Sequence, residues 1–164
     1  ILHALRDEWD VVHVQLYNSG SQYVYTGGDM DPATDPIVEQ GTAEFVAGLT
    51  EMVILGFPVE RNPDVVFPGL GADKVAVGLP ATPRSASGGY VPESEVYRAF
   101  RALWNGESKG FPFRLRNPDG YPLLRGFMTW SLNWDRTGDG GSAPFAFVSM
   151  AAGLVHGPGE NVEE

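Results

Sequence analysis

Short apolar runs alternate with segments of helical period along this chain, and the alternation restricts the fold more than any other feature. Strand-like runs cover 11–18, 74–80 and 124–131, and helix-like segments cover 42–56 and 92–105. Nearly continuous apolar runs of this length are typical of strands in parallel sheets. Strands that alternate with helices form βαβ units. The sequence therefore predicts an α/β fold with three parallel strands and with both helices on one side of the sheet.

Both helix-like segments carry start or stop signals. In the first, apolar residues recur at spacings of three and four after the candidate N-cap Thr42, and Gly56 ends the pattern. The second opens at Pro92, which we expect in the first helical turn. A last short helix is expected over 143–154.

Polar and aromatic side chains gather where the first and third strand-like runs end. Gln15, Tyr17 and Asn18 close the first run, Trp130 lies near the end of the third, and Asp135 follows shortly after it. Sites in barrels and doubly wound sheets lie at the carboxyl ends of parallel strands, so we expect these side chains at one rim. An indole face beside amide and carboxylate groups suits a sugar ring. The alternative is that both tryptophans of this segment, Trp130 and Trp134, are ordinary core residues.

Composition excludes several classes of function. The chain has 21 acidic and 11 basic residues, and this net charge of −10 argues against nucleic acid and anionic membrane surfaces as partners. It has no cysteine, its three histidines lack metal-ligand spacing, and no glycine-rich phosphate loop follows the first strand. We therefore predict no metal and no cofactor.

His13 alternates with Val12 and Val14 on the first strand-like run, which predicts a buried histidine.

Three segments resemble the sixth, seventh and eighth strands of a bacterial-type glycoside hydrolase family 18 chitinase. They are Val14-Gln-Leu-Tyr-Asn-Ser19, Val77-Gly-Leu-Pro-Ala81 and Gly126-Phe-Met-Thr-Trp-Ser-Leu-Asn-Trp-Asp135. The resemblance implies an α/β fold of the partial TIM (β/α)₈ barrel type, with about three C-terminal βα units. Residues 1–156 would form this part of the barrel, and 157–164 would be a frayed tail. It also implies a secreted protein whose substrate is chitin or a chitooligosaccharide.

The resemblance assigns roles to individual residues. Tyr17 would act as a catalytic residue that hydrogen-bonds the N-acetyl carbonyl of the sugar at the cleavage site. Gln15 and Asn18 would lie nearby, Trp130 would form the floor under that sugar, and Met128 would line the same subsite. Hydrolysis in this family is substrate-assisted and retaining, because the acetamido oxygen of the sugar attacks the anomeric carbon. For Asp135, two roles remain open: it accepts from a sugar hydroxyl, or it caps the helix that follows.

One departure from the family pattern limits the expected activity. The catalytic motif D-x-x-D-x-D-x-E, whose glutamate is the general acid, does not occur in the sequence. The chain also starts in the middle of an amphipathic pattern, so we expect it to be part of a longer protein. Its partner would then be the missing N-terminal half of the barrel, or a second copy through self-association. The alternatives are a non-catalytic chitin-binding or N-acetylglucosamine-binding relative and an endo-β-N-acetylglucosaminidase.

Overall fold

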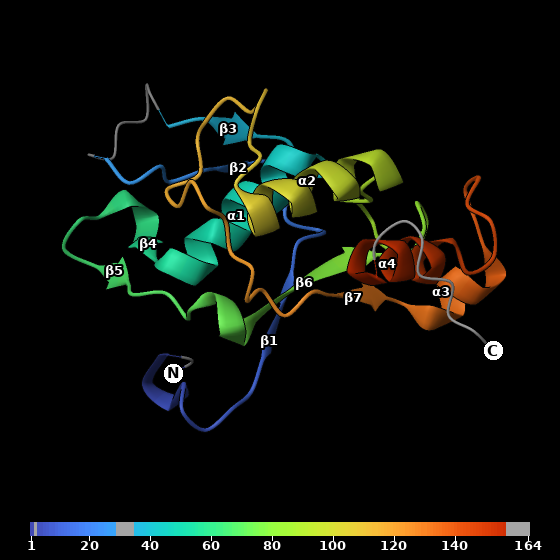
Figure 1. The fold of residues 1–164 in the computed structure, drawn as a ribbon, viewed down its shortest axis with the longest axis horizontal. Coiled ribbons are helices and arrows are strands. Elements are labelled where there is room, and N and C mark those ends of the chain that lie inside the picture. Colours follow the sequence, from blue (N-terminus) through green and yellow to red (C-terminus); the bar gives the residue numbers. More distant parts are fainter. Residues whose placement is uncertain (2, 29–34, 157–164) are drawn as a thin grey trace.

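A three-stranded parallel sheet organises the fold (Figure 1). The computed structural model describes residues 1, 3–28 and 35–156. The strands are β1 (Val12–Gln15), β2 (Gln22–Tyr23), β3 (Ile37–Val38), β4 (Phe57–Pro58), β5 (Val66–Phe67), β6 (Val75–Pro80) and β7 (Phe127–Trp130). The helices are α1 (Ala43–Leu55), α2 (Glu93–Asn105), α3 (Leu132–Thr137) and α4 (Ala146–His156), and 3-10 turns cover His3–Leu5, Val59–Arg61 and Ala72–Lys74. The predicted tail at 157–164 lies outside the described residues.

The central sheet has the strand order β1-β6-β7, and both pairings are parallel. Gln15 lies opposite Gly78, and Gly78 lies opposite Met128, so the middles of the three sequence motifs stand side by side. The prediction of three parallel strands in one sheet is confirmed. The strands are shorter than the predicted runs. On β1, the chain leaves the extended conformation at Asn18, whose φ is 59°.

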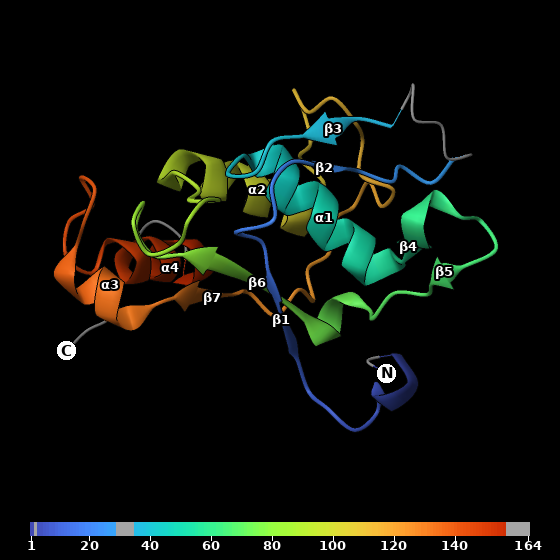
Figure 2. The same cartoon turned by 180° about the vertical axis from the view of Figure 1, so that it is seen from behind.

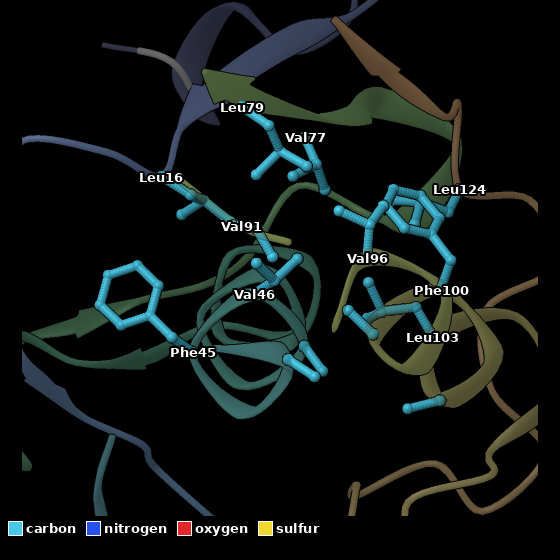
Figure 3. Packing of buried hydrophobic residues seen from close by; sticks show 14 of the residues in the cluster. Leu16, Phe45, Val46, Val77, Leu79, Val91, Val96, Phe100, Leu103 and Leu124 are labelled. Atoms are coloured by element: carbon cyan, nitrogen blue, oxygen red, sulfur yellow. The ribbon is translucent and has the colours of Figure 1, made fainter. Parts of the chain in front are cut away.

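Helices α1 and α2 cover one face of this sheet, as predicted (Figures 1 and 2). Figure 3 shows Val77 and Leu79 of β6 directed toward Val46 of α1 and Val96 of α2. All four side chains are almost fully buried. Burial of a Val or Leu side chain contributes about 1.5–3 kcal/mol, so this layer accounts for much of the stability of the fold.

The helix boundaries largely follow the sequence signals. Thr42 is the N-cap of α1, and its Oγ1 accepts a hydrogen bond of 3.2 Å from the Phe45 amide. Gly56 ends the same helix with a φ of +89°. Pro92 is the N-cap residue of α2, one position before the predicted first turn, because its ψ of 149° is extended. Helix α4 begins at Ala146, three residues inside the predicted range.

Two hairpins lie within the long connections that follow β1 and α1. Strand β2 pairs with β3, and β4 pairs with β5, both in antiparallel orientation. Each of these strands has two residues, which is too short to produce a periodic signal in sequence.

In the described part of the chain, no helix has the length and apolar character needed to cross a membrane.

A buried carboxylate fastens the long connection between α2 and β7 to α1. Glu51 Oε1 accepts hydrogen bonds from the Arg116 amide and the Tyr121 hydroxyl, both at 2.7 Å. The Arg116 guanidinium lies 3.6 Å from Glu51 Oε2 and donates to the Gly56 carbonyl at 3.0 Å. Burial and the Glu51 hydrogen bond strongly raise the pKa of Tyr121, which therefore remains a neutral donor. No local pattern in the sequence predicts this network, because its members lie 65 and 70 positions apart.

Candidate functional site

The sheet face opposite the helices carries the predicted site residues. Side chains alternate along a strand, so residues next to the core-facing Val14 and Val77 point away from α1 and α2. On β1 these residues are His13 and Gln15, and both are exposed. The prediction that His13 is a buried histidine is therefore wrong. The alternation was identified correctly, but Val12 and Val14 face the helices and His13 lies on the uncovered face.

Gly78 stands at the centre of this open face, between Gln15 and Met128. A Cβ atom there would lie 3.0 Å from the Val14 carbonyl oxygen and 3.4 Å from Met128 Cε. The absence of a side chain thus makes room for the half-buried Met128 on the neighbouring strand. The motif around Gly78 predicted no role for this residue, and the strand register shows why a small residue is required there.

Tyr17 lies just beyond β1, at the carboxyl edge of the sheet. The ladder continues through the Leu16 amide, which donates to the Gly78 carbonyl at 3.1 Å, so Tyr17 follows at the level of Pro80. The Tyr17 side chain is only 6% exposed, but it is not part of the core cluster under the helices. Burial raises the pKa of the Tyr17 hydroxyl, so this group remains protonated and can donate a hydrogen bond at neutral pH.

Trp130 lies at the same edge as Tyr17, with β6 between them. It pairs with Pro80 in the register, and its carbonyl accepts from the Ala81 amide at 2.9 Å. The peptide bond from Trp130 to Ser131 is cis. The indole of Trp130 is 52% exposed, so the alternative that it is a core residue is wrong. The described residues place Tyr17 and Trp130 at one rim, and a cleft shared by them remains a prediction.

Gln15 and Asn18 both have partners in the structure. The Gln15 amide nitrogen donates to the Tyr17 carbonyl at 3.2 Å, which leaves its oxygen on the open face. The Asn18 amide oxygen accepts from the Gly88 amide at 3.1 Å, and the Asn18 backbone amide donates to the Gly88 carbonyl at 3.1 Å. Both side chains are exposed at the rim. Their polar groups can meet a ligand, but Asn18 also holds a neighbouring loop.

Asp135 has a different role from the predicted sugar contact. It is only 1% exposed, and its two carboxylate oxygens accept from the Phe147 amide at 2.8 Å and the Val148 amide at 3.2 Å. These amides belong to the first turn of α4, where N–H groups have no carbonyl partner within the helix. Asp135 therefore caps α4, as the second of the two predicted roles stated. The expectation that it contacts sugar is corrected.

The site as built consists of an exposed indole, a neutral tyrosine, two amides and a thioether on one sheet edge. These residue types can stack on a sugar ring and hydrogen-bond an acetamido group. Among the residues that the structure describes, no group of three His, Asp or Glu side chains is arranged to hold a metal ion. The geometry defines an α/β protein in which aromatic and polar side chains gather at the carboxyl edge of a parallel sheet.

Comparisons with known proteins agree with this class. No protein-family model matches the chain. The chain is 38% identical over 135 residues to Chitinase D of Niallia circulans, a match that covers 82% of this chain and 24% of that protein. It is also 38% identical over 144 residues to Exochitinase 1 of Streptomyces olivaceoviridis, with 84% and 21% covered. The chain thus spans about a quarter of the length of these curated relatives.

Comparison with solved structures also points to family 18 chitinases. A family 18 chitinase from Chromobacterium violaceum superposes with a TM-score of 0.77 at 32% identity, over 94% of this chain and 37% of that chain. The resemblance to family 18 chitinases is therefore confirmed. This chain is homologous to a segment of such enzymes.

Proposed function

We propose that this chain supplies the last three βα units of a (β/α)₈ barrel that hydrolyses β-1,4-linked N-acetylglucosamine. The observation that carries the proposal is the strand register, which brings Tyr17, Pro80 and Trp130 to one carboxyl edge. Active sites of such barrels lie at this edge. The parallel order β1-β6-β7, with α1 and α2 outside, is the order that consecutive units of a barrel would have.

The proposed mechanism assigns separate tasks to these side chains. The exposed face of Trp130 forms the floor on which the reacting sugar stacks, and Met128 fills the space beside Gly78. The neutral Tyr17 hydroxyl donates to the acetamido carbonyl and orients its oxygen toward the anomeric carbon. Orientation of this kind lowers the entropic part of the barrier, because the acetamido oxygen is already held near the anomeric carbon. A dry aromatic floor shields the positive charge that develops on the sugar. The reaction is substrate-assisted and retaining.

The general acid is proposed to come from outside these 164 residues, since the D-x-x-D-x-D-x-E motif is not in the sequence. Loss of a general acid removes about 10²–10⁴-fold in rate, so the chain by itself should bind chitooligosaccharides without cleaving them. The whole protein would be a secreted chitinase. The missing motif also favours a second candidate, a chitin-binding relative in which the floor persists without the acid.

A titration with chitotetraose, the β-1,4 tetramer of N-acetylglucosamine, tests the proposal on the chain as it stands. The indole N–H signal of Trp130 in the NMR spectrum should shift on binding. Trp130→Ala should weaken binding by about 2 kcal/mol, close to thirtyfold in Kd, as expected for the loss of an aromatic anchor. Trp134→Ala is the matched control, because Trp134 is also exposed, at 38%, but lies in α3 beyond the sheet. Equal losses in both variants would contradict a floor at Trp130.

Hydrolysis of the same tetramer separates the two candidates. Products from the 164-residue chain alone would overturn the assignment of the general acid to another segment. Cleavage by a longer protein that contains this chain would support the enzyme, whereas binding without cleavage there would support the chitin-binding relative.

A further inference from the structure

The loop after β6 lies against the end of β1, where Tyr17 and Asn18 are found. A Cβ atom on Gly89 would lie 2.8 Å from Tyr17 Cα and 2.9 Å from Tyr17 Cβ, and the φ of Gly89 is +91°. Any side chain at Gly89 would therefore collide with the backbone that carries the Tyr17 ring. Gly89 therefore packs directly against Tyr17, the residue that is proposed to donate to the acetamido carbonyl.

Asn18 and Gly88 join the same two segments by reciprocal hydrogen bonds. The Asn18 amide donates to the Gly88 carbonyl, and the Gly88 amide donates to Asn18 Oδ1, each at 3.1 Å. Asn18 adopts a φ of 59°, a left-handed conformation that asparagine tolerates better than most residues. The side chain and the backbone of Asn18 thus fix the position of the strand end together.

The chain beyond Asn18 is held as well. Gln40 Oε1 accepts from the amides of Ser19 at 2.6 Å and Gly20 at 2.7 Å. On the far side, the loop after β6 is tied to the segment after α3, because Arg84 lies 3.2 Å from Asp139. The loop therefore spans the rim from β1 to the end of α3, with contacts at both of its ends.

We propose that Asn18, Gly88 and Gly89 form a positioning clamp that sets the orientation of Tyr17. In this role Asn18 acts through the clamp, and Tyr17 alone meets the acetamido group. The clamp rests on the proposed function for its purpose, but its geometry can be tested without any sugar. This separation allows the failure of one proposal to be told from the failure of the other.

The first test compares two variants of Asn18 in the 164-residue chain. Asn18→Asp keeps an oxygen acceptor for the Gly88 amide, whereas Asn18→Gly keeps the left-handed backbone and removes that acceptor. Loss of one hydrogen bond should speed hydrogen exchange at the Gly88 amide by about fivefold and shift the Tyr17 ring signals in the NMR spectrum. Asn18→Asp should remain close to the parent chain on both readouts. Identical behaviour of the two variants would overturn the clamp.

The second test uses Gly89→Ala, with Gly141→Ala as the matched control. Gly141 has a similar φ of +96°, but a Cβ atom there would meet no heavy atom within 4 Å. Both variants carry the backbone cost, and only Gly89→Ala adds the collision with Tyr17. We expect Tyr17 ring shifts and at least about fivefold weaker chitotetraose binding in Gly89→Ala alone. Unchanged Tyr17 signals in Gly89→Ala, or equal changes in both variants, would contradict the proposal. If Gly89→Ala does not fold, the Asn18 pair decides.

Discussion

Tyr17 combines two properties that rarely occur together, a buried ring and a position at the rim of a sheet. Burial disfavours the tyrosinate and raises the pKa of the hydroxyl, and the described residues offer that hydroxyl no hydrogen-bond partner. We predict that Tyr17 titrates above the ordinary tyrosine value of 10.0. An NMR titration of the ring carbons will measure this value. A Tyr17 midpoint at or below that of free tyrosine would show that the ring is solvated and the pocket open.

The proposed role of Tyr17 also predicts a kinetic signature in an intact enzyme that contains this chain. Tyr17→Phe removes the donor and keeps the ring, so the packing against Gly89 should persist. Because acetamide orientation counts most in the transition state, kcat should fall by about tenfold or more with little change in KM. Tyr23→Phe is the control, because it also removes a tyrosine hydroxyl, one that donates to the Pro58 carbonyl. A variant whose KM rises at constant kcat would assign Tyr17 to ground-state binding instead.

At the level of elements, charged side chains join α1 to α2. Glu95 of α2 accepts from the Ala43 amide in the first turn of α1 at 3.0 Å, and Arg98 contacts both Glu95 at 2.8 Å and Glu44 at 2.6 Å. Desolvation favours the neutral acid, but the hydrogen bonds from Ala43 and Arg98 and the charge of Arg98 outweigh it and lower the pKa of Glu95. Glu95 therefore acts as a cap for a helix other than its own.

This lowered pKa predicts how stability depends on pH. Ionised Glu95 stabilises the fold at pH values above its ordinary pKa of 4.5, and that contribution is lost as the pH falls through the lower, folded-state pKa. Urea unfolding between pH 6 and pH 3 should show a smaller loss of stability for Glu95→Gln than for the parent chain. Glu93→Gln, which changes an exposed glutamate in the same turn, is the control. Equal pH dependence in all three proteins would refute the cap.

The Glu51 network predicts a larger effect on stability. Glu51→Ala would leave the Arg116 guanidinium, now in contact with Glu51 and half-buried, without its carboxylate. Removal of one partner from a buried ion pair costs about 3–5 kcal/mol, which urea unfolding can measure. Tyr121→Phe removes a single hydrogen bond to the same carboxylate and should cost about 1 kcal/mol. A Glu51→Ala cost no larger than that of Tyr121→Phe would show that the connection between α2 and β7 does not depend on this carboxylate.

For the whole molecule, periodic patterns in the sequence predicted the strands and helices. They did not predict the side-chain roles that depend on contacts between distant residues. Parallel strands and two covering helices follow from local apolar patterns, and the structure confirms them. The role of Asp135 was open because it depends on amides 12 and 13 positions away, and no local spacing shows that contact. His13 was placed on the wrong face because an alternation of three residues does not say which face of the sheet the helices cover. The rim residues were predicted from the family resemblance and from their positions at strand ends. The register shows that Tyr17 and Trp130 lie at the same edge of the sheet.

Both outer strands of the sheet leave apolar surface beside them. Along β1, a groove of about 310 Å³ is lined by residues that include Val14, Leu49, Val53 and Phe57. Where the chain enters β7, a second groove of about 350 Å³ is lined by Trp104, Leu124 and Leu154 together with the polar Asn105 and Arg125. β1 and β7 each pair on one side only within the described sheet. Unpaired strand edges beside apolar grooves favour pairing with another chain.

We therefore predict that the 164-residue chain associates in solution, either with the remainder of a barrel or with a second copy of itself. Size-exclusion chromatography with light scattering should show a mass that rises with concentration. Val53→Lys places a charge in the groove along β1 and should shift the equilibrium toward monomer, because burial of an unpaired charge is costly. Ile37→Lys is the matched control, since Ile37 is exposed on β3 and does not line either groove. A stable monomer at all concentrations would show that these edges need no partner, and it would contradict this prediction.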